Sequence, residues 1–218
     1  MKVAVFGGSF NPLHIGHAML ADTIVKEYGY DKVLFVPTST PPHKIISGNV
    51  TPVQRAEMIQ RFCEEEGDGH FELETCEIDR GGISYTVDTL SFLQKKYEGK
   101  LEGKLAFIMG DEVAAEFSKW KNPEKIIEVA DLIITRRYAD WASLEKSTYK
   151  NTATLNYNSE YNKNFNINDF QYKCFYIDKP ILPVSSTEIR QRICENRSFK
   201  YLVPKSVFEY ILEKGLYK

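Results

Sequence analysis

Two histidines spaced three residues apart follow a glycine-containing loop near the start of the chain. His14 and His17 would lie on one face of a helix that begins near Ile15. Gly7 and Gly8, which precede them, let the backbone come close to a ligand. A helix start adds unpaired N–H groups and a partial positive charge. A phosphate bound here would meet backbone donors, a helix dipole and two imidazoles, so we predict a phosphate site.

Simpler interpretations of this loop must be considered too. A glycine pair after a strand often serves only the turn, and a single histidine is usually a surface or core group. However, the chain has four histidines, and His14, His17 and His43 all follow its first strand closely. This clustering favours a functional role. Zinc binding by His14 and His17 is an alternative, but no nearby cysteine or second His/Glu pair completes a ligand set.

A second group of phosphate-binding residue types lies near the other end of the chain. Ser185, Ser186 and Thr187 begin a predicted helix, and Glu188 fits a capping box with Ser185. Capping needs only one hydroxyl. Three in a row, with Arg190 on the first turn, suit phosphate binding by several donors.

The segment 37–44, Pro-Thr-Ser-Thr-Pro-Pro-His-Lys, follows a predicted strand at 33–36. Adjacent prolines cannot join a sheet, so we expect a stiff loop at the carboxyl end of that strand. Parallel sheets bind ligands at that edge. His43 and Lys44 are therefore expected to face the same crevice as the first histidine pair. The alternative is a surface loop with a solvated lysine.

A further helix is predicted after Gly82, with Ser84 or Thr86 as its cap. Capping alone would explain both hydroxyl residues. Tyr85, between them, could instead line a pocket.

Carboxylates and an aromatic side chain follow a predicted central strand at 105–109. After Gly110, the side chains of Asp111 and Glu112 can accept hydrogen bonds from ribose hydroxyls. They would also be favoured simply by the positive end of a helix. Trp120, at the end of the short helix that follows, is either a packing residue or a stacking surface for a planar heterocycle.

Strands that alternate with helices should position these groups. Apolar runs predict strands at 3–6, 33–36, 71–78, 105–109, 132–134 and 175–177. Helical spacing predicts helices from 15 to about 28, from a Thr51 cap to about 62, from about 86, from an Asn122-Pro123 start to 129, from 186 and over 204–212. This alternation indicates an α/β fold with a doubly wound, mostly parallel, Rossmann-like sheet. We expect one domain over 1–218, with a variable insertion at about 137–170 and a C-terminal helical end at about 185–218.

Bulk composition limits the possible partners. The 218 residues carry a formal net charge of −2, which argues against broad nucleic-acid binding. The acidic run at 64–66 is expected to be a solvated face. Four scattered cysteines, at 63, 76, 174 and 194, are expected to be buried free thiols in a reducing cytosol. No apolar run is long enough for a signal sequence or a membrane span, so a cytoplasmic protein without membrane contact is expected.

The segment at 7–17, GGSFNPLHIGH, resembles the HIGH-containing element of a group of nucleotidyltransferases. Within that group, the chain is most similar to the bacterial nicotinate-nucleotide adenylyltransferases. The similarity also covers 37–44, 84–90, 110–121, 185–190 and the Tyr-Leu-Val-Pro segment at 201–204. One difference is that Glu112 stands where the family has an aspartate, with Asp111 before it. Which of the two carboxylates contacts the ribose is left open.

This resemblance implies adenylyl transfer from ATP to nicotinate mononucleotide, with Mg²⁺, giving deamido-NAD and pyrophosphate. It implies catalytic roles for His14, His17 and Lys44. It implies ATP binding by Gly7, Gly8, Ser9, Phe10, Ser185, Ser186, Thr187, Ile189 and Arg190. It implies mononucleotide binding by Tyr85, Thr86, Gly110, Asp111, Glu112 and Trp120.

Other functions remain as alternatives. The acceptor could be nicotinamide mononucleotide or phosphopantetheine. A class I aminoacyl-tRNA synthetase shares the HIGH motif but would need a longer chain and a lysine-rich second motif. A non-catalytic nucleotide-binding module is a more distant alternative. A homo-oligomer is also left open.

Overall fold

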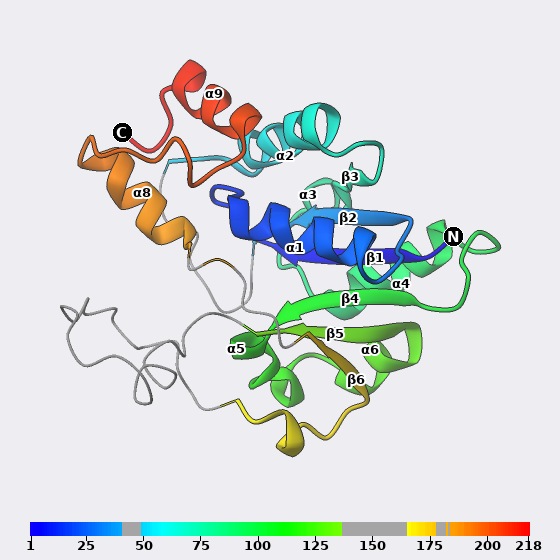
Figure 1. Ribbon diagram of the computed structural model, residues 1–218. Coiled ribbons are helices and arrows are strands. Elements are labelled where there is room, and N and C mark those ends of the chain that lie inside the picture. The colour runs from blue at the N-terminus through cyan, green and yellow to red at the C-terminus, as the bar shows by residue number, and fades with distance from the viewer. Residues whose placement is uncertain (41–48, 137–164, 178–181, 183) are drawn as a thin grey trace.

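A single parallel sheet forms the centre of the molecule. The computed structural model describes residues 1–40, 49–136, 165–177, 182 and 184–218 (Figure 1). Within these residues, six parallel strands follow the order β3-β2-β1-β4-β5-β6. They are β1 (Val3–Gly8), β2 (Lys32–Pro37), β3 (Phe71–Leu73), β4 (Leu105–Gly110), β5 (Ala130–Thr135) and β6 (Cys174–Ile177). The predicted doubly wound sheet is confirmed.

Helices cover both faces of this sheet. The α-helices are α1 (Ile15–Lys26), α2 (Pro52–Glu66), α3 (Cys76–Arg80), α4 (Thr86–Lys96), α5 (Asp111–Ala114), α6 (Pro123–Val129), α8 (Ser186–Cys194) and α9 (Lys205–Lys214). The described part of the chain also contains the short 3₁₀-helices η1 (Phe117–Lys119) and η3 (Ile167–Asp169). Alternate residues of β1 face opposite layers. Ala4 and Phe6 belong to a core with α1, α2 and α9, whereas Val3 and Val5 belong to a core with α4 and α6 (Figure 1).

The strand order reverses between β1 and β4. β2 and β3 lie on one side of β1, while β5 and β6 extend from β4 on the other. At such a switch point the loops after the two central strands turn to opposite faces, and a crevice opens at the carboxyl ends of the strands. The predicted site residues after β1 and β4 therefore share one edge of the sheet. Helix α8, orange in Figure 1, lies at that end of the molecule.

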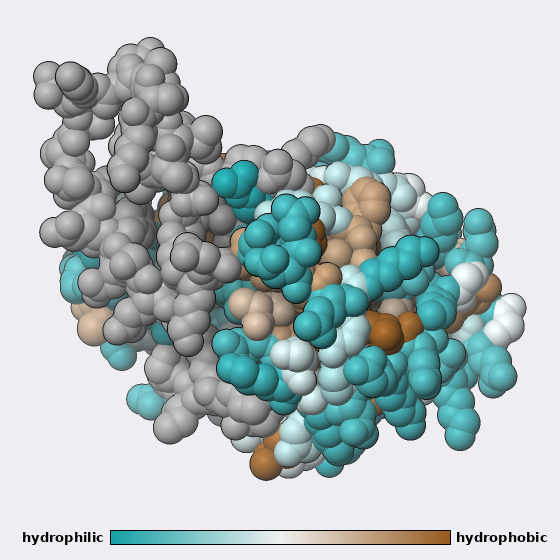
Figure 2. Space-filling model, turned by 90° about the horizontal axis from the view of Figure 1, so that it is seen from below, coloured by the Kyte–Doolittle hydropathy of each residue, from teal (hydrophilic) through white to brown (hydrophobic). Residues whose placement is uncertain are grey.

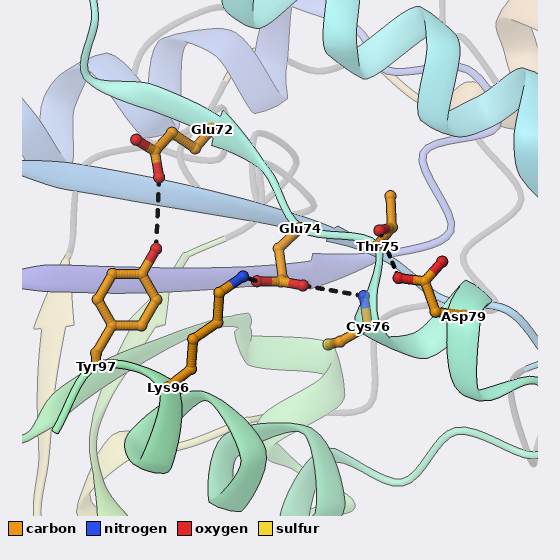
Figure 3. A network of polar contacts seen from close by, with 7 residues as sticks. All are labelled: Glu72, Glu74, Thr75, Cys76, Asp79, Lys96 and Tyr97. Carbon is orange, nitrogen blue, oxygen red and sulfur yellow. Dashed lines mark hydrogen bonds and ion pairs between the residues drawn. The ribbon is translucent and has the colours of Figure 1, made fainter.

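The strand predicted at 71–78 is wrong in its second half, because β3 ends at Leu73 and α3 begins at Cys76. Buried Glu74 explains the change (Figure 3). One of its carboxylate oxygens accepts the N–H of Cys76 at 3.1 Å, and the other accepts the ammonium of Lys96 at 2.6 Å. The hydroxyl of Thr75 donates to Asp79 at 2.8 Å. These contacts stabilise a helical turn where the sequence alternates like a strand.

The acidic run at 64–66 is exposed, as expected for a solvated face. Glu66 has a further role that the sequence did not indicate, because it accepts hydrogen bonds from both the backbone N–H (3.0 Å) and the hydroxyl (2.6 Å) of Ser206 at the start of α9. Its carboxylate therefore ties the end of α2 to the start of α9.

The four cysteines are free, but they differ in burial. Burial raises the pKa of Cys63 and of Cys76 to about 12, so both thiols stay protonated at neutral pH. Cys174 is half-buried and Cys194 is exposed. The expectation of buried thiols is correct for two positions and wrong for Cys194.

Hydrophilic residues cover most of the described surface on the face in Figure 2, where hydrophobic residues appear in small separate patches. In the part of the chain that the structure describes, no helix combines the length and hydrophobicity needed to cross a bilayer. Most of the predicted insertion, residues 137–164, lies outside the described residues. Its end, 165–170, includes η3, and the ring of Phe170 lies 5.9 Å from that of Phe117.

Candidate active site

The loop between β1 and α1 takes its shape from packing of Phe10 against Gly8. Phe10 has a φ of +42°, in the left-handed region, and its ring is buried. A Cβ added to Gly8 would lie 3.1 Å from this ring. The ring also lies 5.0 Å from that of His17, so the glycine, the phenylalanine and the histidine form one packed unit.

The two histidines lie against each other, as their spacing predicts. The N–H of His14 donates to Nδ1 of His17 at 3.1 Å, and the rings stack with centroids 3.7 Å apart. Because Nδ1 of His17 accepts a hydrogen bond, its neutral imidazole carries the proton on Nε2. His14 is buried, while His17 is partly exposed. His17 therefore provides an N–H donor at the start of α1.

Helix α8 is hydrogen-bonded to the loop between β1 and α1, although the two segments are more than 170 residues apart in the sequence. The hydroxyl of Ser186 donates to the carbonyl of Pro12 at 2.9 Å, and Nη1 of Arg190 donates to the carbonyl of Asn11 at 2.7 Å. The two helix starts that carry the phosphate-binding residue types thus meet at one edge of the sheet. The structure thus brings together the two helix starts for which phosphate binding was predicted, and the binding itself stays a prediction. Ser185 caps α8 as predicted, accepting the N–H of Glu188 at 3.1 Å.

The contacts of α8 also add a role that the sequence did not predict. Ser186 and Arg190 were expected to bind phosphates, but in this structure each donates a hydrogen bond to the loop itself. Nη2 of Arg190 donates to the hydroxyl of Thr187 at 3.2 Å. Ile189, expected among the ATP-binding residues, is fully buried and packs in the core beside α1. Ser186 and Arg190 therefore position residues 9–14, which lead from β1 to His14 and the start of α1. We call this segment the histidine-bearing loop.

Arg55 of α2 was missed as a site residue. Its side chain is fully buried, and its guanidinium donates to the carbonyls of Ser9 and Thr38, both at 2.7 Å. Burial lowers the pKa of Arg55, while nearby Tyr217 and Glu77 act in the opposite direction. In the sequence, Arg55 falls at the helical spacing of the apolar residues of α2. A charged residue on an apolar face was the signal that could have indicated a buried role.

The chain after β2 is hydrogen-bonded to the end of β1 and to the segment between α3 and α4. The N–H of Thr38 donates to the carbonyl of Gly8 at 2.9 Å, and the carbonyl of Thr40 accepts the N–H of Ser84 at 3.0 Å. Buried Glu77 accepts the hydroxyl of Thr89 at 2.7 Å, and burial raises the pKa of its carboxyl. His43 and Lys44, predicted to face the crevice from this loop, lie outside the described residues.

The predicted cap of α4 is wrong. The N-cap is Tyr85, without a side-chain hydrogen bond, and Thr86 is the first helical residue. The ammonium of Lys121 lies 4.2 Å from the centre of the Tyr85 ring and 3.1 Å from Asp88. Trp120 is half-buried. Lys121, which directly follows Trp120, therefore connects this segment with the start of α4.

Trp120 packs against two aromatic residues of the core. Its ring lies 5.3 Å from Phe117 and 6.0 Å from Phe107. Packing accounts for one part of its surface, and the partial exposure leaves the stacking role as a prediction.

Gly110 brings two carboxylates to the carboxyl end of β4. It is the N-cap of α5, whose first turn holds Asp111 and Glu112. A Cβ on Gly110 would lie 2.5 Å from Oε2 of Glu112, so the Glu112 carboxylate folds back over the glycine. Asp111 accepts the N–H of Glu112 at 2.9 Å. Because β4 is the parallel neighbour of β1, both acidic residues lie at the same edge of the sheet as the loop that follows β1.

Fold and site together define an α/β protein with a doubly wound parallel sheet and a candidate ligand site at its switch point. A family model described as cytidylyltransferase-like matches residues 5–192, and the chain belongs to this family. Curated relatives match its whole length and carry the name probable nicotinate-nucleotide adenylyltransferase. That of Borrelia garinii subsp. bavariensis is 37% identical, with 100% of this chain and 95% of the relative covered. Those of Treponema pallidum strain Nichols and Caldicellulosiruptor saccharolyticus are 36% and 38% identical, with both chains fully covered. Within the family, the chain is similar to these relatives along its full length.

Solved structures share the fold. A putative nicotinate-nucleotide adenylyltransferase from Vibrio parahaemolyticus matches with a TM-score of 0.64 and 20% identity, covering 100% of this chain and 96% of that one. The nicotinic acid mononucleotide adenylyltransferase of Plasmodium falciparum, complexed with NaAD, matches with a TM-score of 0.70 and 18% identity, covering 99% and 97%.

Proposed function

We propose that the protein transfers the adenylyl group of ATP to nicotinate mononucleotide, giving deamido-NAD and pyrophosphate. One observation carries the site: α8 is hydrogen-bonded to the histidine-bearing loop through Ser186 and Arg190. Phosphate-binding residue types from both ends of the chain are thereby gathered at the switch point. Full-length relatives named for this activity support the choice of acceptor.

The reaction needs positioning and charge stabilisation rather than a covalent enzyme intermediate. The phosphate of the mononucleotide is ionised at neutral pH and attacks the α-phosphorus of ATP. The bond from the α-phosphorus to the bridging oxygen breaks, and pyrophosphate leaves with that electron pair. His14 and His17 stabilise the negative charge that develops on the α-phosphate and pyrophosphate oxygens, with Nε2–H of His17 as one donor. Lys44, outside the described residues, is proposed as a further cation.

The remaining residues bind the two substrates. For ATP these are Gly7, Gly8, Ser9 and Phe10 together with the start of α8. For the mononucleotide they are Tyr85, Thr86 and Trp120 around the pyridine ring and Asp111 or Glu112 at the ribose. Gly7 to Phe10 at the end of β1 and the two carboxylates at the end of β4 lie at one edge, because these strands are adjacent and parallel, and this supports placing the two substrates side by side.

Mg²⁺ is proposed as the partner of ATP. Among the described residues there is no cluster of three or more His, Cys, Asp or Glu side chains that could hold a metal ion. The described side chains alone therefore do not supply a ligand set for Mg²⁺. We propose that Mg²⁺ is held mainly by the triphosphate oxygens, since Mg²⁺ commonly keeps substrate phosphates and water as ligands. A cytoplasmic location, inferred from the free cysteines, is also a proposal.

A parallel assay of pyrophosphate release tests the function. The purified protein is given Mg²⁺ and ATP with nicotinate mononucleotide, nicotinamide mononucleotide or phosphopantetheine, and a sample without acceptor is the control. We expect the highest kcat/KM with nicotinate mononucleotide. A higher value with either other acceptor would change the substrate. ATP binding without pyrophosphate release from any acceptor would leave a nucleotide-binding module. Light scattering of the same sample measures the oligomeric state.

A further inference from the structure

Arg55 joins two loops that leave neighbouring strands. It lies in the first turn of α2, whose start is fixed by a capping box between Thr51 and Gln54. One guanidinium nitrogen donates to the carbonyl of Ser9 after β1, and the other donates to the carbonyl of Thr38 after β2, both at 2.7 Å. The same planar group therefore spans the two loops.

Complete burial makes this arrangement costly. A guanidinium removed from water loses its hydration, and only well-formed hydrogen bonds offset that loss. An apolar side chain of similar size would fill the same space without this penalty. The feature that the arginine alone provides is a rigid fork that holds two acceptors at a fixed separation.

The loop that Arg55 holds leads directly into the proposed catalytic residues. Ser9 precedes Phe10, whose ring contacts His17 at 5.0 Å. On the far side of the loop, α8 holds the carbonyls of Asn11 and Pro12. Carbonyls at positions 9, 11 and 12 therefore accept hydrogen bonds from two different helices, and Arg55 supplies the contact on the β2 side.

We propose that Arg55 is a positioning residue for adenylyl transfer. It fixes the separation between the β1–α1 loop and the loop after β2, and thereby holds His14 and His17 in register with the substrates. This inference rests on the proposed function for its kinetic consequence. The loop contact itself can be tested without activity. Arg55 does not touch the substrates; it acts through Ser9 and Thr38.

Arg55→Lys is the primary test, and Arg61→Lys on the same helix is the matched control. A lysine keeps the charge but cannot span both carbonyls. Arg61 lies near the surface, where it pairs with Glu213 at 2.8 Å. Steady-state kinetics for both substrates, the thermal midpoint and hydrogen exchange of residues 9–13 are measured for each protein.

We expect Arg55→Lys to lower kcat about 10- to 100-fold, because small misplacement of catalytic groups has effects of this size. KM should change less, and exchange should quicken in residues 9–13 and around Thr38 ahead of the rest of the chain. Arg61→Lys should match wild type. Unchanged kcat with unchanged loop exchange in Arg55→Lys would overturn the proposal. So would a loss of kcat accompanied by equally faster exchange throughout the chain, since this indicates a purely structural role.

Two further measurements keep the outcomes distinct. If Arg55→Lys does not fold, Arg55→Gln replaces it, since a neutral amide avoids the cost of a buried charge and reaches only one carbonyl. If wild type releases no pyrophosphate, the proposed function fails. The exchange of residues 9–13 in the Arg55 variants then still decides whether the guanidinium holds the loop.

Discussion

His17 uses its two ring nitrogens differently. Nδ1 accepts the N–H of His14, which leaves the proton of the neutral ring on Nε2. The side chain thus enters the site as a hydrogen-bond donor with a fixed orientation. The stacked His14 ring and the Phe10 ring hold it from two sides. Such a donor suits stabilisation of charge on phosphate oxygens rather than removal of a proton.

Replacing His17 with alanine should therefore reduce turnover. We expect His17→Ala to lower kcat roughly 10²–10³-fold, the effect of losing one preorganised donor. Pyrophosphate release under saturating substrates measures it. His70→Ala is the control, because His70 lies near the amino end of β2, at the edge of the sheet opposite the candidate site. Its carbonyl accepts the N–H of Val33 there. Wild-type turnover in His17→Ala would exclude the catalytic role.

Trp120 can be tested by separating binding from stability. Its ring already contacts Phe107 and Phe117. We expect Trp120→Ala to raise the KM for nicotinate mononucleotide with a smaller effect on kcat, because a stacking surface for the pyridine ring is lost. Trp120→Phe should restore part of the affinity. If only the thermal midpoint falls, Trp120 is a packing residue.

Helix starts were easier to predict than strand ends. Thr51 and Ser185 have local signatures, a hydroxyl followed by Gln54 or Glu188 three residues later, and both cap their helices as expected. The end of β3 has no such signature. The alternation over 71–78 fits a strand equally well, and the helical turn there depends on Glu74, which is bonded to Lys96 more than twenty residues away.

The same limit applies to Glu66, whose role depends on a helix far along the chain. Glu66→Ala removes the acceptor for the N–H and hydroxyl of Ser206. We expect a loss of about 0.5–2 kcal/mol in the free energy of unfolding, the size of a lost cap, with kcat unchanged. Urea unfolding measures it, and exposed Glu65→Ala is the control. Equal stability of the two variants would show that this contact contributes nothing.

At the scale of the molecule, alternation of strands and helices was enough to predict the sheet and the edge where the candidate site lies. The two helix starts that carry the predicted phosphate-binding residues meet because parallel topology brings the loops after the strands to one edge. The contacts of Arg55, by contrast, link Ser9 and Thr38 through side-chain geometry that leaves no periodic pattern in the sequence.

Buried Glu77 gives the molecule a specific pH dependence. Burial raises the pKa of this carboxyl in the folded state above its ordinary value of 4.5. The folded state therefore binds the proton more tightly than the unfolded state. The contribution of Glu77 to stability is complete below pH 4.5 and is lost as the pH rises through the raised pKa.

Glu77→Gln isolates this contribution, because glutamine resembles the protonated carboxyl at every pH. We expect the free energy of unfolding of wild type, minus that of the variant, to fall as the pH rises from 4.5 towards 8. Urea unfolding of both proteins across this range measures the difference. A difference that stays constant or increases with pH would contradict the burial effect.

The short loop at residues 9–13 has a consequence for how the protein folds. Its supports are Arg55, Ser186, Arg190 and Tyr217, whose hydroxyl donates to the Asn11 side chain at 2.8 Å. Three of the four lie more than 170 positions along the chain from their partners. Contacts between such distant positions form slowly, because a long loop must close first. A refolding molecule should thus regain its helical circular dichroism before it regains its enzymatic activity.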